Sequence, residues 1–405
     1  MLLSGKKVLL GVTGGIAAYK TTYLVRLLIK AGAEVKVILT PEARDFVTPL
    51  TLSTLSKNPV YWSFFDEDDD SGTWHNHVEL GLWADYFIIA PCTANTLSKM
   101  TSGASDHFLL ATYLSAKCPV FFAPAMDLDM YKHPSTKANI DKLTTYGNIF
   151  IKPGTGELAS GLSGEGRMAE PEEIIETLID YIQSKLPLKG KRILVNAGPT
   201  YEAIDPVRFI GNYSSGKMGV SIAIAAMKLG ATVDLVVGPG VQVPTGLTNV
   251  TRITSARELL DVCSSKFTSV DIAILSAAVS DYRPENTADR KLKKDGGAMH
   301  LTLVENPDVL ATLGKTKNEN QILVGFALET NDPLENARKK LHKKNCDFIV
   351  LNQPTANTGF AHDTNEVTLV SNIDEPKVLG LKKKEEIAYE ILEYISTKFI
   401  NQHLK

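Results

Sequence analysis

The sequence predicts an α/β protein made of two three-layer αβα domains, each with a mainly parallel sheet. The chain has 405 residues, which suits two domains of roughly 150–250 residues better than a single core. Two apolar runs, at residues 7–12 and 192–196, are each followed by a glycine-containing turn, as is typical of buried parallel strands. After each run, helix and strand patterns alternate, which favours parallel sheets with helices on both faces.

The first half continues with one helix pattern and three strand patterns. An amphipathic stretch at residues 16–29 predicts a helix that ends near Gly32, because glycine is favoured just after a helix. The next strands are predicted at residues 35–39, 87–90 and 120–123. In open sheets of this kind, ligands bind at the carboxyl ends of the strands, so the loops after these strands are the candidate site.

The boundary between the halves is predicted near residue 188, which gives domains of 1–187 and 188–405. A helix from Pro171 to about Lys185 closes the first half, because a proline and acids in the first turn favour a helix start. The second half is predicted to contain a helix at 218–229 and strands at 233–237, 272–275, 324–326 and 348–351.

Composition argues against several classes of function. The net charge of −3 gives no reason to expect nucleic acid as a partner. No apolar stretch approaches the ~20 residues of a membrane span, and the first residues lack a signal-peptide pattern. The four cysteines are scattered without a CxxC pair, which favours reduced thiols and a cytoplasmic location.

Small and polar residues follow the predicted strands of the first half. Gly14 and Gly15 open the first helix, where glycine lets the backbone approach an anion, although such a pair is more often only a turn. Thr40, taken alone, is more often a cap for a helix that starts at Pro41. His77, taken alone, is more often a structural histidine. The glycine pair also lacks the G-x-G-x-x-G spacing of NAD-dependent dehydrogenases, which disfavours that class.

Together with the segments 91–96 and 124–131, these residues resemble the homo-oligomeric flavin-containing cysteine decarboxylases, over residues 5–180. The resemblance implies a flavodoxin-like or Rossmann-like flavoprotein domain that binds FMN and converts 4′-phosphopantothenoylcysteine into 4′-phosphopantetheine. It also implies that His77 is catalytic, either in acid–base chemistry or in orienting the substrate carboxylate. The residues that it implies for FMN binding are Gly14, Gly15, Ile16, Ala17, Thr40, Thr93, Asn95, Ser105 and Asp106.

Two positions depart from the pattern of that family. Asp127 stands where asparagine is usual, so it is either protonated by its site or contacts another group. Ser160 stands where many relatives carry a cysteine that protonates the intermediate, and a hydroxyl is a much weaker acid than a thiol. Both residues are expected to be catalytic, with the proton coming from Glu157, from Ser160 through water, or from Cys92. The departures keep a second hypothesis open, a flavin-binding module that no longer decarboxylates but is fused to an active ligase.

The second half opens with a polar and glycine-rich segment. Residues 212–219, Asn-Tyr-Ser-Ser-Gly-Lys-Met-Gly, lead into the predicted helix and suit an anion, but they are not a Walker A motif. With the segments around Asp281, Lys291, Asp308 and Phe326, they resemble phosphopantothenate–cysteine ligase over nearly the whole second half. The resemblance implies a Rossmann-like ligase domain that joins 4′-phosphopantothenate to L-cysteine, with CTP as co-substrate and an acyl-cytidylate intermediate.

The same resemblance implies the roles of individual residues in the second half. Asn212 contacts the acyl-cytidylate and Lys291 serves its formation, so both are expected to be catalytic. The triphosphate needs cations and a divalent metal, Mg²⁺ or Mn²⁺, for which Asp281 is the expected ligand. The family also implies a homo-oligomer with trimeric flavin sites and dimeric ligase domains, expected to be a dodecamer. The implied nucleotide site consists of Ser276, Ala277, Asp281, Lys291, Asn306, Pro307, Asp308, Val309, Phe326, Lys340 and Lys344.

Overall fold

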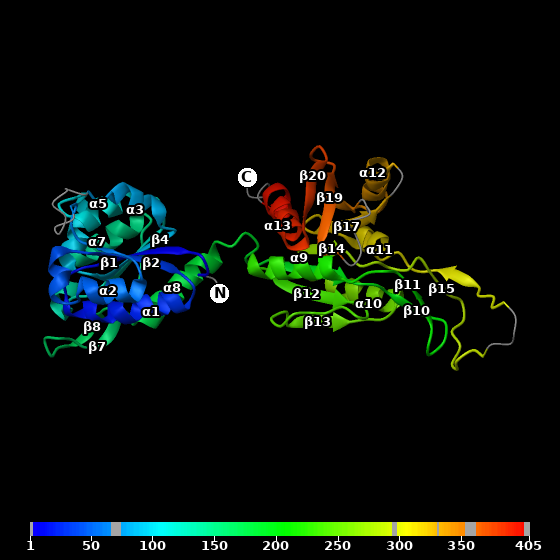
Figure 1. Ribbon diagram of the computed structural model, residues 1–405, viewed down its shortest axis with the longest axis horizontal. Helices are drawn as coiled ribbons and strands as arrows, with labels where there is room; N and C mark the ends of the chain where they lie inside the picture. Colours follow the sequence, from blue (N-terminus) through cyan, green and yellow to red (C-terminus); the bar gives the residue numbers. More distant parts are fainter. Residues whose placement is uncertain (1–2, 66–73, 294–297, 330–331, 353–361, 401–405) are drawn as a thin grey trace. The chain divides into compact units, whose positions relative to one another are not determined.

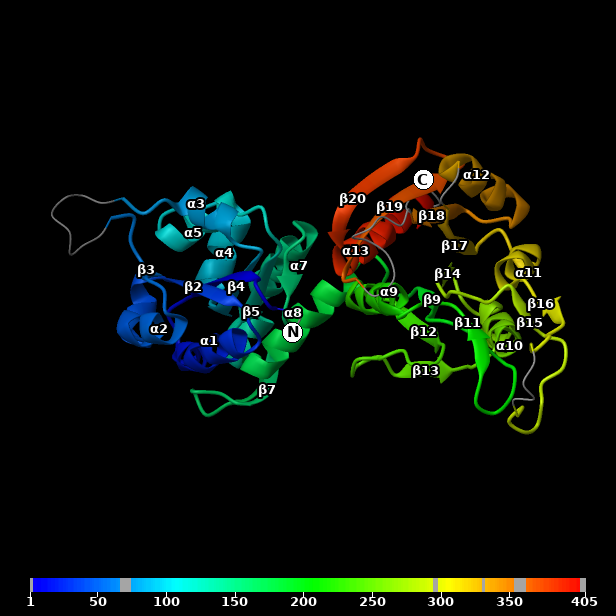
Figure 2. The same cartoon turned by 45° about the vertical axis from the view of Figure 1, so that its right-hand side comes forward.

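The structure, a computed structural model, describes residues 3–65, 74–293, 298–329, 332–352 and 362–400. The chain forms two compact units, Met1–Ser184 and Lys185–Lys405, which Figures 1 and 2 show in two views. Each unit has a main sheet between two layers of helices, so the predicted αβα architecture is confirmed for both. In the described part of the chain, no helix has both the length and the apolar character that crossing a membrane requires.

The first unit is built on a six-stranded sheet in which all neighbouring strands are parallel. In spatial order the strands are β3 (Val60–Tyr61), β2 (Glu34–Leu39), β1 (Lys7–Val12), β4 (Tyr86–Cys92), β5 (Val120–Pro124) and β6 (Ile149–Phe150). Val8 pairs with Val35 on one side and with Tyr86 on the other, so the strand order reverses beside β1. The loops that leave β1 and β4 therefore run to opposite faces, which is where such sheets bind ligands.

Helices cover both faces of this sheet. They are η1 (Ile16–Lys20), α1 (Thr21–Lys30), η2 (Pro41–Asp45), α2 (Pro49–Ser56), α3 (His77–Trp83), α4 (Ala94–Ser102), α5 (Phe108–Ser115), α6 (Leu128–Lys132), α7 (Pro134–Thr145) and α8 (Pro171–Ser184). Along β1, Val8 and Leu10 belong to the core shared with α1, α2 and α8, whereas Leu9 belongs to the core shared with α3, α4, α5 and α7. This alternation follows from the two-residue period of a strand. Figure 2 shows α1 and α2 on one side of the sheet and α3, α4 and α5 on the other.

Three details of the first unit differ from the sequence expectations. The helix predicted at 16–29 starts as the 3₁₀ turn η1 and becomes α-helical only at Thr21, as is common at helix starts. Thr40 lies at the start of η2, but its hydroxyl caps no backbone amide there. A hairpin of β7 (Gly154–Glu157) and β8 (Ser163–Arg167) was not predicted, because its glycine, serine and charged residues carry no apolar pattern.

The second unit is built on an eight-stranded sheet in which the first six strands are parallel and the last two are antiparallel. In spatial order the strands are β13 (Asn249–Arg252), β12 (Thr232–Val237), β9 (Arg192–Ala197), β14 (Ile272–Leu275), β17 (Ile322–Leu328), β18 (Phe348–Asn352), β19 (Thr364–Ser371) and β20 (Lys377–Lys383). Two hairpins lie outside this sheet, β10 (Tyr201–Ala203) with β11 (Phe209–Gly211) and β15 (Tyr282–Pro284) with β16 (Leu303–Glu305).

Helices again cover both faces of the second sheet. They are α9 (Lys217–Lys228), α10 (Ala256–Phe267), α11 (Val309–Thr316), α12 (Pro333–Lys343), α13 (Lys384–Ile395) and the π-helical turn η3 (Ser396–Ile400). Ile193 and Val195 of β9 belong to the core shared with α9 and α13. Leu194 between them belongs to the core shared with α10, α11 and α12. The apolar run at 192–196 is therefore buried on both faces, as predicted.

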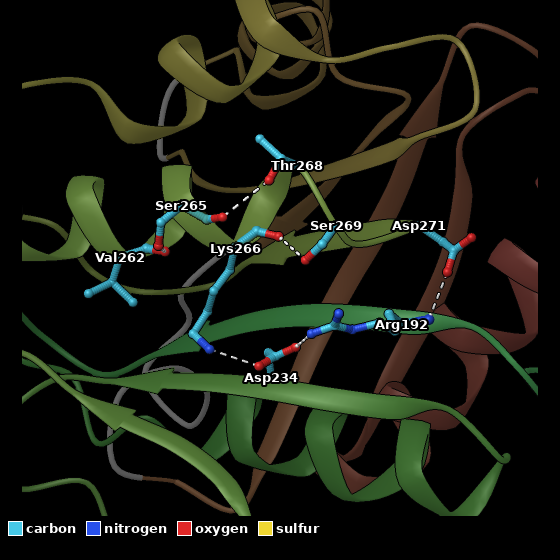
Figure 3. A network of polar contacts seen from close by, with 8 residues as sticks. All are labelled: Arg192, Asp234, Val262, Ser265, Lys266, Thr268, Ser269 and Asp271. Atoms are coloured by element: carbon cyan, nitrogen blue, oxygen red, sulfur yellow. Dashed lines mark hydrogen bonds and ion pairs between the residues drawn. The ribbon is translucent and has the colours of Figure 1, made fainter.

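An ion network around the buried carboxylate of Asp234 joins strands of the second unit toward their amino-terminal ends (Figure 3). The Asp234 side chain in β12 is 4% exposed and accepts hydrogen bonds from Lys266 Nζ and Arg192 Nη2, each at 2.8 Å. Asp271, directly before β14, accepts a bond from the Arg192 amide at 2.7 Å. The network lies away from the loops that follow the strands, so its role is to hold β9, β12 and α10 together.

Candidate active sites

A cavity of about 760 Å³ opens in the first unit at the carboxyl ends of its central strands. The loops that follow β1, β2, β4 and β5 contribute to it, together with the hairpin β7–β8. A sheet of this topology binds ligands at this place, because the loops diverge there. The predicted residues that line the cavity are Gly14, Gly15, Ile16, Ala17, Thr40, Thr93, Asn95, Asp127 and Ser160.

The loop after β1 lies unusually close to its neighbours. The Thr13 hydroxyl donates to the Pro91 carbonyl at 2.8 Å and accepts from the Thr93 amide at 3.1 Å. A Cβ on Gly14 would lie 2.7 Å from Cβ of Glu42 and 3.1 Å from its carbonyl carbon, so a side chain does not fit there. The loop lines the cavity at the start of a helix, a place that suits a phosphate group.

Thr40 brings an unsatisfied polar group to the same cavity. The residue is buried, and its Oγ1 has no hydrogen-bond partner among the described residues. A buried hydroxyl without a partner is unfavourable by about 1–3 kcal/mol, so a ligand that supplies the partner is the natural explanation. With the glycine loop and the volume of the cavity, Thr40 fits a bound flavin, whose phosphate and ring offer many hydrogen-bonding groups.

The two residues that depart from the family pattern contact each other. The Ser160 hydroxyl donates to Asp127 Oδ1 at 2.9 Å, and the Leu128 amide donates to the same oxygen at 2.6 Å. Asp127 directly precedes α6 near the carboxyl end of β5, whereas Ser160 lies in the turn between β7 and β8. The hairpin packs tightly on α6, because a Cβ on Gly164 would lie 2.5 Å from Cδ1 of Leu128. The turn therefore places Ser160 directly on Asp127.

The structure distinguishes between Glu157 and Cys92, the other two proton donors that the sequence left open. Glu157 lines the cavity, but Cys92 does not. Cys92 is buried in the core at the end of β4, and burial raises the pKa of its thiol, which makes it a weaker acid.

His77 is not among the residues that line this cavity. It begins α3, and its ring packs edge-on against aromatic rings of the same unit. Its Nδ1 is buried without a hydrogen-bond partner in the part of the chain that the structure describes. The aromatic partners are Phe64, Trp74 and Phe108. Within one chain, His77 and the Asp127–Ser160 contact are therefore not parts of the same cavity, and the catalytic role of His77 stays a prediction.

Ser105 and Asp106 also lie outside the lining, whereas Lys99 and His107 are among the lining residues that were not predicted. Asp106 accepts a hydrogen bond from Lys99 Nζ at 2.6 Å, and Lys99 itself lines the cavity. His107, which also lines it, accepts from the Leu110 amide at 3.4 Å as the cap of α5, and burial lowers the pKa of its ring. A polar residue directly before an apolar helix was the signal in the sequence that could have identified His107.

A second cavity, of about 910 Å³, lies at the carboxyl ends of strands in the second unit. The Asn212 side-chain amide donates to the Val279 carbonyl at 2.9 Å, and that of Asn306 donates to the Ser280 carbonyl at 2.8 Å. Both amides therefore brace the loop that follows β14. The predicted residues that line the cavity are Asn212, Ala277, Asp281, Asn306, Pro307, Asp308, Val309, Phe326, Lys340 and Lys344.

Two lysines from the C-terminal end of α12 give this cavity positive charge. Lys340 Nζ donates to the Phe326 carbonyl at 2.8 Å, and burial lowers the pKa of this lysine. Lys344 pairs with Asp308, whose Oδ1 accepts the Ala311 amide at 2.8 Å. Burial acts to raise the pKa of Asp308, but the hydrogen bonds from Lys344 and the Ala311 amide outweigh it, so the pKa is lowered. Asp308 is thus ionised at neutral pH and holds Lys344 at the cavity wall.

Ser276 and Lys291 are not among the described residues that line this cavity. The Ser276 hydroxyl donates to the Asn196 carbonyl at 2.6 Å. Lys291 is exposed in the segment after β15, and the amide of its neighbour Leu292 donates to Asp205 at 3.1 Å. Asp281 lines the cavity and is exposed. Among the residues that the structure describes, no group of three or more His, Cys, Asp or Glu side chains is arranged to hold a metal ion.

Comparisons with known proteins match both units. The family model described as Flavoprotein matches residues 2–183. The family model described as the DNA/pantothenate metabolism flavoprotein C-terminal domain matches residues 188–399. A solved structure, the crystal structure of the C-terminal domain of the coenzyme A biosynthesis bifunctional protein CoaBC, is 41% identical and covers 54% of this chain and 100% of its own, with a TM-score of 0.46.

The relatives that match most of this chain carry two different names. The coenzyme A biosynthesis bifunctional protein CoaBC of Bacillus subtilis (strain 168) is 44% identical over 399 residues, which is 98% of each chain. The protein of the same name from Vibrio vulnificus (strain CMCP6) is 44% identical over 400 residues, again 98% of each chain. A cysteine/cysteine sulfinic acid decarboxylase from an unknown prokaryotic organism is 51% identical over 357 residues, which is 87% of this chain and 99% of that relative.

The two family matches fall on the two units, and each unit has its own cavity at the carboxyl ends of its strands. The identity to the CoaBC proteins extends across both units. The chain therefore belongs to the family of bifunctional coenzyme A biosynthesis proteins, in which an FMN flavoprotein unit with decarboxylase activity precedes a unit with ligase activity.

Proposed function

We propose that the first unit decarboxylates 4′-phosphopantothenoylcysteine to 4′-phosphopantetheine. The observation that supports this most is the cavity at the strand ends, which combines the Gly14–Gly15 loop, the unpartnered Thr40 hydroxyl and the Asp127–Ser160 contact. FMN, when bound, would supply a reversible two-electron acceptor, which would allow carbon dioxide to leave in a reaction without net oxidation. The glycine loop would hold the FMN phosphate, and the Thr40 hydroxyl would hydrogen-bond the flavin. Asp127 faces the substrate carboxylate.

In this proposal, His77 acts on the cavity of a neighbouring subunit. It does not line the cavity of its own chain, and its buried Nδ1 has no partner among the described residues. Around it, Trp74, Val78 and Leu82 are 51%, 43% and 55% exposed. Large apolar side chains that gather at a surface favour a protein interface. Flavin sites completed across a trimer interface, combined with dimeric ligase units, give the expected dodecamer.

The second unit, we propose, joins 4′-phosphopantothenate to L-cysteine with CTP. The phosphopantothenate carboxylate attacks the α-phosphate of CTP and pyrophosphate leaves, after which the cysteine amine attacks the acyl carbon and releases CMP. Lys340 and Lys344 are compact positive charges suited to the triphosphate. Asp281 is suited to the Mg²⁺ or Mn²⁺ that accompanies a nucleotide. Asn212 contacts the acyl-cytidylate, and Lys291 serves its formation from the adjacent loop.

One incubation tests both halves of the proposal. Purified protein receives phosphopantothenate, cysteine, CTP and Mg²⁺, and the products are identified by mass. The wild-type chain is expected to form phosphopantetheine, and His77→Asn is expected to stop at phosphopantothenoylcysteine. Phosphopantetheine from His77→Asn would show that the role given to His77 is wrong. A wild-type chain that forms neither phosphopantothenoylcysteine nor phosphopantetheine would refute the ligase assignment.

Free cysteine is a second candidate substrate of the first unit. The observation that favours it is the 51% identity to a relative named a cysteine/cysteine sulfinic acid decarboxylase. A competition experiment separates the two, with equal amounts of cysteine and phosphopantothenoylcysteine that carry different isotopes in their carboxyl groups. Our proposal expects most of the released carbon dioxide to come from phosphopantothenoylcysteine. Release mainly from cysteine would favour the second candidate.

A further inference from the structure

We propose that Asp127 is the proton donor of the decarboxylase unit and that Ser160 is the residue that positions it. The inference rests on the proposed decarboxylation of 4′-phosphopantothenoylcysteine. It assigns the step after carbon dioxide has left, when the remaining enethiolate must gain a proton. The two residues that differ from the family pattern then act together: Asp127 is the acid, and Ser160 keeps its side chain in place.

The geometry around Asp127 supports this assignment. Its Oδ1 accepts hydrogen bonds from the Ser160 hydroxyl at 2.9 Å and from the Leu128 amide at 2.6 Å. Its Oδ2 has no hydrogen-bond partner among the described residues, although the carboxyl group lines the cavity. One oxygen therefore fixes the group in place, and the other remains available to the substrate.

The substrate itself provides the reason for a proton on Asp127. Two ionised carboxylates in contact repel each other, so one of them takes up a proton, as in pairs of catalytic aspartates. With the substrate carboxylate beside Oδ2, the protonated Asp127 can donate a hydrogen bond to it. A side-chain amide at this position would make the same donation. Asp127 thus carries a proton next to the carbon from which carbon dioxide departs.

The step that follows balances without a further reactant. Loss of carbon dioxide leaves an enethiolate, with a carbon–carbon double bond and a negatively charged sulfur. The O–H bond of Asp127 breaks and a C–H bond forms at the carbon that lost the carboxylate, while the sulfur becomes doubly bonded to the neighbouring carbon. The electron pair withdrawn at the start then returns to the neighbouring carbon together with a hydrogen, as a hydride, and the resulting thiolate takes a proton from solvent. Asp127 is left ionised and regains a proton from solvent or with the next substrate.

The alternatives are less well placed. A serine hydroxyl is a poor acid, so Ser160 is suited to hold Asp127 and not to replace it. Cys92 does not line the cavity, and burial weakens it as an acid. Glu157 lines the cavity but lies in β7, in the hairpin, whereas Asp127 lies near the carboxyl end of β5 itself. Glu157→Gln is therefore the matched control for Asp127→Asn.

The test is an anaerobic single turnover with phosphopantothenoylcysteine. FMN content and the thermal unfolding midpoint are first measured for each variant, and both are expected to match the wild type. Flavin reduction is followed by absorbance, and the saturated thiol and the enethiol, which is two hydrogens lighter, are separated by mass. Asp127→Asn is expected to release carbon dioxide and reduce FMN but to shift the ratio of the two products toward the enethiol by roughly tenfold or more.

Two further variants test the coupling of the pair. Ser160→Ala is expected to shift the product ratio in the same direction by a smaller factor, because Asp127 is still present but less well held. Ser160→Cys in the Asp127→Asn background supplies a thiol at the same turn and is expected to restore the saturated product. Glu157→Gln is expected to leave the ratio unchanged.

Several outcomes would overturn the inference. They are a wild-type product ratio in Asp127→Asn, a shift toward the enethiol in Glu157→Gln, or no rescue by the added cysteine. An Asp127→Asn variant that retains FMN but neither reduces it nor releases carbon dioxide would place Asp127 before the loss of carbon dioxide, which also contradicts the inference. By contrast, a wild-type chain that releases no carbon dioxide would refute the proposed function itself.

Discussion

The cavities of the two units occupy corresponding places in similar sheets but differ in the groups that line them. In the first unit, small residues such as Gly14, Thr40 and Thr93 surround the strand ends, and a hairpin contributes to the wall. In the second unit, Lys340 and Lys344 project from a helix into a cavity that also holds carboxylates. The sheet topology explains where each cavity lies, whereas the loops and helix ends determine which chemistry it suits.

The largest expected effect comes from removing a positive charge from the second cavity. Lys340→Met keeps a side chain of similar length but loses the charge, and we expect ligase kcat/KM to fall roughly 100-fold, or about 3 kcal/mol. Carbon dioxide release from added phosphopantothenoylcysteine should stay within about twofold of the wild type, since Lys340 belongs to the other unit. Steady-state kinetics of the two reactions on one preparation measure both. A comparable loss in both reactions would contradict the independence of the cavities.

The next largest effect is expected in the ion network at the other end of the strands from the second cavity, and it should change stability but not ligase activity. Asp234→Asn removes a buried carboxylate that two cations hold, and we expect the free energy of unfolding to fall by about 2 kcal/mol without a change in ligase kcat. Hydrogen exchange of the β12 amides, together with ligase kinetics, tests this. A loss of kcat at constant stability would instead assign Asp234 to the reaction.

The contribution of the Asp234 carboxylate to stability is expected to depend on pH. Burial opposes ionisation of Asp234, but the hydrogen bonds and charges of Lys266 and Arg192 outweigh it and lower its pKa in the folded state. The group therefore binds its proton less tightly when folded, so its stabilising effect is present above about pH 4, the unfolded value, and is lost as pH falls through the folded pKa. The stability difference between the wild type and Asp234→Asn should be constant from about pH 5 to 7 and shrink below about pH 4. A difference that grows on acidification would contradict this account.

A smaller effect is expected in the first cavity, at the glycine loop. Gly14→Ala places a methyl group 2.7 Å from Cβ of Glu42, so we expect the first unit to lose about 1.5 kcal/mol of stability. Gly15→Ala is the control, because the nearest atom to its Cβ would be 3.8 Å away. Unfolding followed by tryptophan fluorescence reports on this unit, since Trp62, Trp74 and Trp83 all belong to it. Equal losses in the two variants would show that the contact with Glu42 is not the cause.

The smallest expected effect is that of a substitution at Thr40, which should stabilise the flavin-free protein but weaken the binding of FMN. Thr40→Val keeps the shape of the side chain and removes a buried hydroxyl that has no partner in the described residues. We expect the flavin-free protein to gain about 1 kcal/mol of stability and FMN affinity to fall by roughly fivefold. Thermal unfolding of the flavin-free protein and a fluorescence titration with FMN measure the two quantities. A variant that binds FMN as tightly as the wild type would exclude Thr40 as a flavin contact.

The sheets were predictable because their strands are continuous apolar runs. The predicted strands 272–275 and 348–351 coincide closely with β14 and β18, and both belong to the cores on two faces of the sheet. The short edge strand β3 has only two residues, which is too few for a pattern. The antiparallel strands β19 and β20 were also missed. In β20, Leu379 is buried but Val378 and Leu381 are exposed, so the strand shows no clear apolar alternation.

The positions of the site residues were only partly predictable. Gly14, Thr40 and Asp127 follow strands of one parallel sheet, so the topology alone brings them to one edge. Ser160 was placed on Asp127 by a hairpin that has no apolar pattern, so the contact could not be foreseen. His77 and Lys291 were assigned by resemblance, and their places outside the cavities depend on how helices and loops pack, which spacing along the chain does not determine.

The most direct test of two separate active sites in one chain is to bypass the first reaction. The Lys340→Met variant is supplied either with phosphopantothenate, cysteine, CTP and Mg²⁺, or with phosphopantothenoylcysteine alone, and phosphopantetheine is measured by mass. We predict little or no product from the first mixture and a wild-type amount from the second. Failure of the variant to convert phosphopantothenoylcysteine, while it retains FMN and its fold, would contradict the account.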